Sequence, residues 1–581
     1  MASPAAHPPT TSERLLAPRL GDGWAIAGLL VIGVAMPALL AFASGAAAIP
    51  HGDDWSYRRF ALTLYEHGRL EYDGWGLASA VGIALPVQPL LWLTGGASWT
   101  FAVLALAFAT VTTAAAFLLV RRLLPLRLAL LAVLSMVFFP GYLRNVTSFS
   151  TDLPMLALML VSLALGGIAL DPDRAYRQRW LTASMVVGVW AFSVREIGIV
   201  APLAVLVSGW LTSPRERRTY IYFGLGLLAA CGLIYLFLAG LPGRPTVPWQ
   251  PLSAINVERV RRTVAIAALG LLPAMPIGIA RWWPAWRRRE VRIGAYVGLL
   301  AAVVFYVREI SMVATGMTPP MFVGEQLKIV GILDTGALFG GRPLLFDGTT
   351  WSLINLIALV SAFAAFAFAG GVVGGLVVNV SRGGRFGGGS GPLLLGVFAL
   401  LYGSGIVGWG LLTTMFDRYL WPLALVLPAL LLYRPGEAVN EPSPRAPRTA
   451  TAAAVLGLAA LIGISLALTF NSFAFDSARW QMGKLAVSQG FAAETVDAGF
   501  EWVGAHSAEK ADPVAAGVLS GEWSYRAAFP SFHLCALVSS TTIDDPAVSL
   551  LVVETRAYRL LLVGGPDEPL YLYRVANPNC R

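Results

Sequence analysis

The chain consists mostly of long apolar runs separated by short polar segments. A helix needs about 20 apolar residues to cross the hydrocarbon core of a bilayer, and thirteen runs meet or approach that length. Residues 79–94 are also apolar, but Pro86 and Pro89 interrupt them, so we expect a re-entrant or interfacial segment there. The predicted spans are residues 24–48, 99–120, 127–141, 153–170, 180–194, 197–211, 219–240, 263–280, 292–307, 351–380, 392–414, 417–433 and 449–470.

Composition excludes a soluble protein. Hydrophobic residues make up 56% of the 581 residues and charged residues 13%, whereas a soluble domain carries about 25% charged residues. Lipid must therefore solvate much of the chain. The formal charge of +9 does not indicate nucleic-acid binding, because the basic residues lie in short clusters between apolar runs, where membrane topology places them.

The distribution of Lys and Arg predicts the orientation, since cytoplasmic loops carry an excess of both. With the N-terminus inside, the inner loops hold 21 Lys and Arg residues, and the longer outer loops before residue 470 hold 13. This asymmetry predicts a multi-pass protein of the plasma (inner) membrane with a cytoplasmic N-terminus and an extracytoplasmic C-terminal segment. The predicted fold class is an α-helical polytopic membrane protein with a small C-terminal extracytoplasmic α/β domain.

Three regions follow from this pattern. Residues 1–23 are predicted to be a disordered cytoplasmic tail, and residues 24–470 a membrane domain with outer loops at 49–98 and 308–350. Residues 471–581 are polar and long enough for a small core of their own. We expect a helix over 477–489 and strands over 548–554, 558–563 and 570–575, with a turn at 564–567.

The three cysteines divide between the two larger regions. Cys231 lies within a predicted span and is interpreted as a small buried hydrophobe. Cys535 and Cys580 both lie in the predicted outer domain, where oxidation is permitted. A disulfide between these two residues and a pair of unpaired thiols are both consistent with the sequence.

Two adjacent carboxylates open the first outer loop directly after the first predicted span. Asp53 and Asp54 precede an amphipathic helix suited to the membrane interface. At a helix start they could serve simply as N-caps. Alternatively, they could supply a general base or bind a divalent cation such as Mg or Mn.

Isolated charges also lie at other outward helix ends. Ionisable groups at bilayer depth are costly and tend to be functional, although interfacial anchoring by snorkelling is the alternative for each. Neighbours on a helix do not face each other, so Arg195 and Glu196, like Arg308 and Glu309, are expected to have different partners. Together these charges indicate one shared site for an anion. A phosphate there would need cationic partners. The further candidates are Asp152, Lys328, Asp417 and Arg418.

Several short motifs occur in an order that resembles the GT-C glycosyltransferases, in the protein mannosyltransferase/aminoarabinose transferase-like branch (bacterial glycosyltransferase family 39-like). The resemblance covers most of the chain. The motifs are Gly52-Asp53-Asp54-Trp55-Ser56-Tyr57, Leu64-Tyr65-Glu66-His67-Gly68, Tyr72-Asp73-Gly74-Trp75, Thr151-Asp152-Leu153-Pro154, Arg195-Glu196, Asp417-Arg418-Tyr419-Leu420-Trp421-Pro422 and Val496-Asp497-Ala498-Gly499-Phe500-Glu501-Trp502.

The resemblance implies an activity and a role for each candidate. Such enzymes move a sugar from a polyprenyl-phosphate donor to a glycan, lipid or protein acceptor at the outer membrane face, usually with inversion. If the roles of the matching family residues apply here, Asp53 is the general base, and Asp54 assists it or holds a divalent metal. Asp152, Glu196 and Asp417 would support the site. The expected cations for the lipid phosphate are Arg195, Arg418, Arg58, Lys328 and Arg308.

Two other function classes fit a polytopic chain. A transporter or flippase of lipid-linked or anionic substrates would show charges near the bilayer midplane, and an assembly protein could keep the fold without catalysis. Here the charges lie at outer helix ends and a polar domain follows the last span. Both features favour an enzyme.

Overall fold

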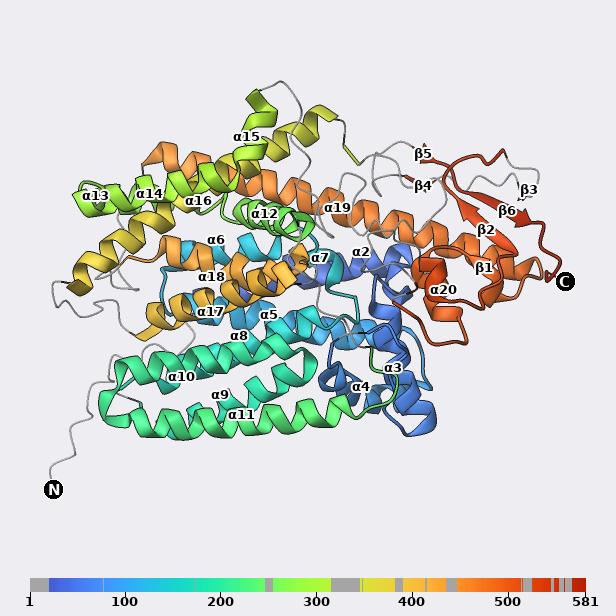
Figure 1. Cartoon of the computed structure of the whole chain (residues 1–581), viewed down its shortest axis with the longest axis horizontal. Helices are drawn as coiled ribbons and strands as arrows, with labels where there is room; N and C mark the ends of the chain where they lie inside the picture. Colours follow the sequence, from blue (N-terminus) through green and yellow to red (C-terminus); the bar gives the residue numbers. More distant parts are fainter. Residues whose placement is uncertain are drawn as a thin grey trace.

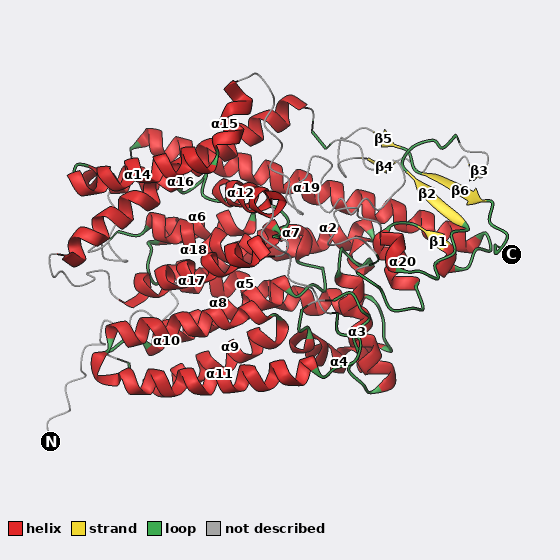
Figure 2. Cartoon of the chain, in the orientation of Figure 1, coloured by secondary structure: helices red, strands yellow, loops and turns green. Residues whose placement is uncertain are grey.

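The computed structural model is rich in helices, with a few short strands near the C-terminus (Figure 2). It describes residues 20–76, 78–172, 174–245, 254–314, 345–346, 348–381, 390–412, 415–434, 447–513, 515, 525–544, 548–552, 558–559 and 567–580. Residues 564–566 of the predicted turn at 564–567, most of the outer loop at 308–350 and Lys328 lie outside these residues. The observed architecture confirms the predicted class, a helical polytopic membrane protein with a small sheet in its C-terminal region.

Within the described part, seven helices are long and apolar enough to cross a membrane. They run side by side along the long axis of the molecule (Figure 1). Three shorter apolar helices accompany them, at Val81–Thr94, Leu126–Val137 and Glu196–Thr212, and the predicted count of thirteen is not confirmed. The seven spans are Gly21–Ser44, Trp99–Arg121, Asp152–Ala169, Pro214–Ala239, Gly348–Gly375, Ser390–Leu412 and Arg448–Ser488.

One predicted span is wrong. Residues 263–280 do not form a single helix, because α12 (Ala254–Leu269) ends there and α13 (Met275–Trp286) begins after a break. Pro273 and Pro276 lie at this break, and proline cannot donate the backbone hydrogen bond that would continue the helix. α12 also begins nine residues before the predicted span, so its three arginines lie on a helix and not in the predicted loop.

The first outer loop folds into two helices. α3 (Asp54–His67) follows Asp53, and α4 (Val81–Thr94) includes Pro86 and Pro89. The fourteen residues of α4 rise about 21 Å, less than the hydrocarbon core of about 30 Å. α4 packs against α3, α5 (Trp99–Arg121) and α9 (Arg177–Val194), so a short non-spanning helix supports α3 from one side.

The last long helix joins the membrane domain to the C-terminal module. α19 (Arg448–Ser488) continues 18 residues beyond the predicted end of its span at 470. A four-stranded sheet with the order β1-β2-β6-β3 follows it. This sheet, α20 (Phe500–His506), α3 and α4 lie at the same end of the molecule (Figure 1). The strands are β1 (Val496–Asp497), β2 (Ala536–Ser539), β3 (Val548–Val552) and β6 (Tyr571–Val575), with β4 (Tyr558–Arg559) and β5 (Asp567–Glu568) forming a second pair.

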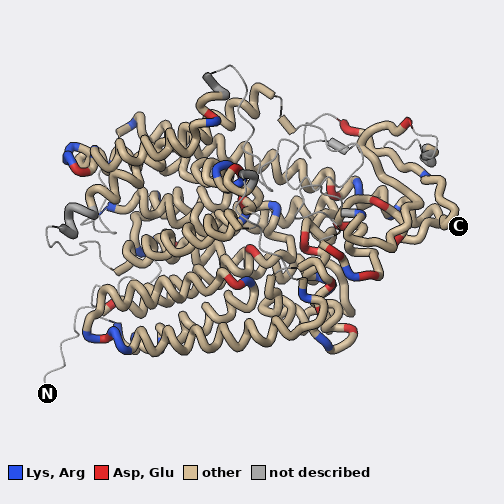
Figure 3. The backbone as a smooth tube through the Cα atoms, viewed as in Figure 1, with Lys and Arg blue, Asp and Glu red and all other residues tan. Residues whose placement is uncertain are grey.

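Charged residues are sparse along the middle of the helices and gather at helix ends and in the C-terminal module (Figure 3). Apolar side chains can therefore face lipid over most of each helix. The remaining helices are α1 (Leu20–Leu30), η2 (Val31–Ala35), α2 (Met36–Ser44), η3 (Ala46–Ala48), α6 (Leu126–Val137), α7 (Tyr142–Asn145), α8 (Asp152–Ala169), η4 (Glu196–Ile199), α10 (Val200–Thr212), η5 (Pro214–Glu216), α11 (Arg217–Ala239), α14 (Arg289–Phe305), α15 (Val307–Ala314), α16 (Gly348–Ser381), α17 (Ser390–Leu412), η6 (Asp417–Leu420), α18 (Trp421–Leu432), η7 (Ala493–Thr495) and η8 (Tyr525–Ala528).

Candidate active site

Asp53 occupies the N-cap position of α3, but its side chain does not cap the helix. Gly52 precedes it with a φ of +59°, in the left-handed region that glycine adopts without strain. The Asp53 carboxylate instead accepts hydrogen bonds from the Trp75 indole N–H at 2.9 Å and from Arg418 Nη2 at 3.0 Å. The capping interpretation therefore does not describe the Asp53 side chain.

A chain of alternating charges leads from Asp53 into the protein. The Nε atom of Arg418, on η6, lies 3.2 Å from Oδ2 of Asp152. The first oxygen of Asp152, at the start of α8, pairs with Arg195 at the end of α9. Arg195 also donates to the hydroxyl of Tyr419 at 2.6 Å. Two arginines and two aspartates from four distant segments thus meet in one place.

Exposure separates the carboxylates of this region. The Asp53 side chain is 28% exposed, whereas that of Asp152 is 4% exposed and that of Asp54 is fully buried. An acceptor group can reach a proton-accepting oxygen only where that oxygen is accessible. Among these three residues, Asp53 is therefore the carboxylate suited to proton transfer with an external substrate.

Asp54 points away from Asp53 into the protein. Both of its oxygens accept hydrogen bonds from Arg58, one from Nε at 2.7 Å and the other from Nη2 at 3.0 Å. The backbone N–H of Phe149 also donates to Asp54, at 3.0 Å. Arg58 in turn donates to the carbonyls of Ala48 and Ile49. This placement differs from the predicted roles, since Arg58 is committed to Asp54 and Asp54 is remote from solvent.

The two aspartates do not fit a shared site for a divalent cation. Such a cation needs several oxygen ligands directed at one point, but the oxygens of Asp53 and Asp54 diverge and face nitrogen donors. Within the described ranges, no group of three or more His, Cys, Asp or Glu side chains has the proximity to hold a metal.

The adjacent charged pairs have separate partners, as predicted. Glu196 accepts from Arg244 at 3.0 Å and from Ser79 at 2.9 Å, while Arg195 pairs with Asp152. Arg308 pairs with Glu258 and Glu309 with Arg261. Arg308 is thus already neutralised and is not brought to Asp53.

Asp417 and Tyr57 are buried side chains next to members of the site. Asp417 is fully buried beside Arg418 on η6, consistent with a role in holding η6. Tyr57, treated in the sequence only as part of an apolar helix face, is buried near Asp53. Burial, and then the charge of Asp53, raise the pKa of Tyr57 above its usual range, so its hydroxyl stays protonated at neutral pH.

Two further residues near the site, Trp75 as an Asp53 partner and Arg259 as a candidate cation, do not stand out in the sequence. Asp73 Oδ1 accepts from the backbone N–H of Trp75 at 3.0 Å, in a local turn that directs the indole towards Asp53. Arg259 is half-buried on α12, which contacts η6. Among the described residues, Arg259 pairs with no carboxylate, whereas Arg261 and Arg262 both do. The signal for Arg259 was its cluster of three arginines.

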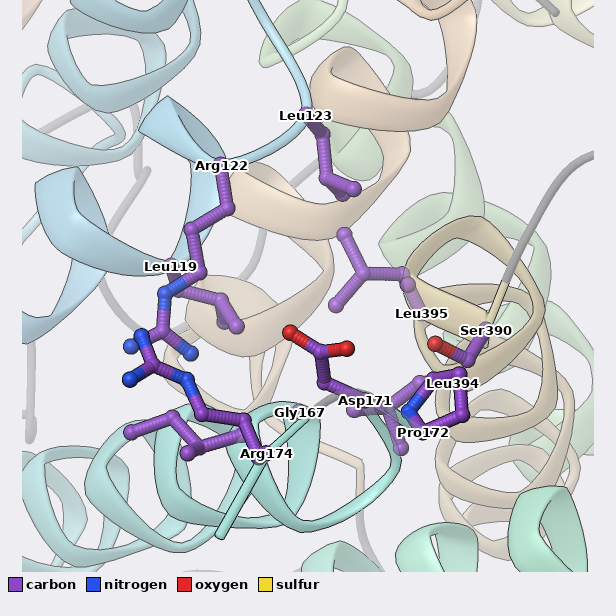
Figure 4. Close-up of a pocket in the computed structure, with 12 residues that line it drawn as sticks. Leu119, Arg122, Leu123, Gly167, Asp171, Pro172, Arg174, Ser390, Leu394 and Leu395 are labelled. Atoms are coloured by element: carbon purple, nitrogen blue, oxygen red, sulfur yellow. The ribbon is translucent and has the colours of Figure 1, made fainter. Parts of the chain in front are cut away.

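A separate cavity lies at the other end of α8. The guanidinium groups of Arg122 and Arg174 lie together along one wall, and the Asp171 carboxylate points into the space between them and Ser390 (Figure 4). Asp171 follows the C-terminal end of α8, whereas Asp152 begins that helix of 18 residues, which is about 27 Å long. The cavity is therefore distinct from the Asp53 site.

The C-terminal module contains a disulfide between Cys535 and Cys580, whose Cα atoms lie 5.5 Å apart. It connects the start of β2 to the C-terminal end of the chain. Cys231 is buried and unpaired.

Comparison with known proteins supports the resemblance. Residues 86–239 match the family of dolichyl-phosphate-mannose-protein mannosyltransferases, so the resemblance to this branch is confirmed over a segment that contains Asp152, Arg195 and Glu196. No curated protein matches the chain.

Two solved structures are similar to the chain along nearly its whole length. ArnT from Cupriavidus metallidurans bound to undecaprenyl phosphate is 12% identical, with a TM-score of 0.43, over 95% of this chain and 98% of that one. The same protein in the apo state is also 12% identical, with a TM-score of 0.38, over 96% and 99%.

Proposed function

We propose that the protein is a membrane glycosyltransferase that moves a sugar from a polyprenyl-phosphate donor to an acceptor hydroxyl. The observation that carries the proposal is the partly exposed Asp53 carboxylate at the start of α3, held beside Arg418 of η6. The match of residues 86–239 to mannosyltransferases that use a lipid-phosphate sugar supports the same reaction class. The sugar is a hexose or pentose, and the acceptor is a glycan, lipid or protein.

The proposed step is an inverting displacement. The acceptor oxygen attacks the anomeric carbon, and the bond between that carbon and the phosphate oxygen breaks, with its electron pair leaving on the lipid phosphate. Asp53 takes the proton of the acceptor hydroxyl as the new bond forms. Arg418 stabilises the charge that develops on the departing phosphate.

Charge balance indicates which cations meet the phosphate. In the described cluster, Arg195 and Arg418 are offset by Asp53 and Asp152, so an arriving phosphate adds unbalanced negative charge. Arg259 supplies a positive charge that has no carboxylate partner among the described residues. Phosphate binding at Arg259 and Arg418 would also draw Arg418 from Asp53 and free that carboxylate to accept a proton.

Replacement of Arg259 by Gln is expected to weaken binding of a short-chain polyprenyl phosphate about tenfold or more, because a hydrogen bond to a charged group contributes about 1.5–3 kcal/mol. Titration of the purified protein with that lipid measures the change. Arg308→Gln is the matched control, since its exposed guanidinium already pairs with Glu258 and surface pairs contribute little. Equal affinities for wild type and Arg259→Gln would remove Arg259 from the phosphate site.

The decisive test of the reaction is transfer of a labelled sugar from a polyprenyl-phosphate donor by the purified protein in proteoliposomes. A glycosylated acceptor is the expected product. Movement of the intact lipid-linked sugar across the bilayer, without any transfer product, would support a transporter or flippase and would overturn the proposal.

We also propose that the site faces the outside of the plasma membrane. The excess of Lys and Arg in the alternate loops supports a cytoplasmic N-terminus, and a disulfide in the C-terminal module fits an oxidising compartment. A membrane-impermeant thiol reagent applied to intact cells is expected to label Ser507→Cys but not Ser213→Cys. The reverse labelling would invert the orientation.

A further inference from the structure

A buried charge network connects the C-terminal module to the loop that carries Asp53. Glu501, on α20, accepts a hydrogen bond from the backbone N–H of Gly52 at 3.0 Å and pairs with Arg479 on α19 at 2.8 Å. Arg479 also pairs with Asp476, at 3.2 Å. The side chains of Glu501, Arg479 and Asp476 are 3% exposed or less, so their geometry is shielded from water.

The same network holds the residue before Gly52. His51 Nδ1 lies 3.1 Å from Asp476 Oδ2, and Arg144 Nη2 lies 3.3 Å from the same oxygen. Burial, and then the charge of Arg144, lower the pKa of His51, so its ring is neutral at neutral pH. Two arginines then balance Asp476 and Glu501, and two consecutive residues before Asp53 are fixed to α19 and α20.

Contacts on both sides of the loop add to this attachment. Trp55 is almost fully buried against Phe500, with ring centroids 5.6 Å apart. A Cβ on Gly504 would lie 2.4 Å from the Trp55 ring, so α20 and α3 are packed at close range. In the segment between α3 and α4, the carbonyl of Asp73 accepts a hydrogen bond from the Ala511 N–H at 2.8 Å.

We infer that Glu501 is a positioning residue for Asp53, acting through the Gly52 N–H, and that the C-terminal module is therefore part of the catalytic unit. This inference rests on the proposed function. Gly52 has a positive φ and no side chain, so the Glu501 hydrogen bond fixes the His51–Gly52 peptide, directly before the Gly52–Asp53 peptide. Displacement of a reacting group by about 1 Å can lower a rate about a hundredfold.

Two substitutions test this role without removing the side chain. Glu501→Gln keeps the shape but replaces one of the two oxygens by an NH2 group, so a donor must then face either the Gly52 N–H or Arg479. Glu501→Asp keeps the charge beside Arg479 while the shorter side chain withdraws the oxygen from Gly52, so it remains informative if the Gln variant is unstable. The matched control is Glu494→Gln, which changes an exposed carboxylate in the same module.

For both Glu501 variants, kcat is expected to fall about tenfold or more, as for other residues that orient a reacting group, while KM for the polyprenyl-phosphate sugar stays within about twofold. Hydrogen exchange of the peptide around Gly52 should become faster, and Glu494→Gln should match wild type in every measurement. Wild-type kcat or wild-type exchange in both variants would overturn the inference, as would a parallel loss of donor-lipid binding. A wild-type protein that transfers no sugar would instead refute the proposed function.

Discussion

Replacement of Asp53 by Asn is expected to lower the rate of sugar transfer about 10²- to 10⁴-fold, the usual contribution of a positioned general base. Asn has the same shape and can still accept from Trp75, but its amide cannot take a proton from the acceptor. Binding of the donor should persist, because Arg418 loses a competing carboxylate and remains available to the phosphate. Transfer kinetics and lipid-phosphate titration measure the two effects separately.

Glu66→Gln provides the matched control, since Glu66 is an exposed carboxylate on the same helix, α3. Its activity should equal that of wild type. Full transfer activity in Asp53→Asn would exclude Asp53 as the base. A loss of donor binding equal to the loss of rate would assign Asp53 to substrate binding instead.

The sequence predicted the residues that build the site more successfully than it predicted their partners. Charges at outward helix ends are costly in a membrane, and this single rule selected Asp53, Asp152, Arg195 and Arg418, which the structure brings together. The rule carries no information about pairing. Arg58, a candidate from the family resemblance alone, is a local partner of Asp54 at i,i+4.

Other members of the site could not be found from local patterns. Trp75 reaches Asp53 only because the Asp73 turn folds the loop back on itself. Glu501 lies 449 residues from Gly52, and its contact depends on how α20 packs beside α3. Arg259 precedes the apolar run that predicts a span at 263–280, so the hydrophobic pattern places it in a loop, whereas α12 begins at Ala254.

The partition of the two adjacent aspartates is the main change that the structure makes to the sequence interpretation. They are consecutive residues, and consecutive side chains at a helix start point about 100° apart. Asp53 therefore faces the accessible side of the loop, and Asp54 faces the protein. Their substitutions should consequently fail in different ways.

Asp54→Asn is expected to destabilise the protein by about 3–5 kcal/mol, because it leaves the buried Arg58 guanidinium without a compensating charge. The thermal midpoint of the purified protein in detergent should fall well below that of Asp53→Asn. The remaining folded molecules should still transfer sugar, since Asp54 does not contact the accessible site. Activity should therefore decline in proportion to the folded fraction.

A double substitution separates the charge effect from loss of the side chain itself. Asp54→Asn combined with Arg58→Gln removes both buried charges, so it should be more stable than Asp54→Asn alone, and the cycle of single and double variants measures the coupling. The Phe149 N–H can still donate to the Asn oxygen, which limits the residual cost. A stable but inactive Asp54→Asn would show that Asp54 contributes to catalysis, by itself or by positioning Asp53, and does not only support the fold.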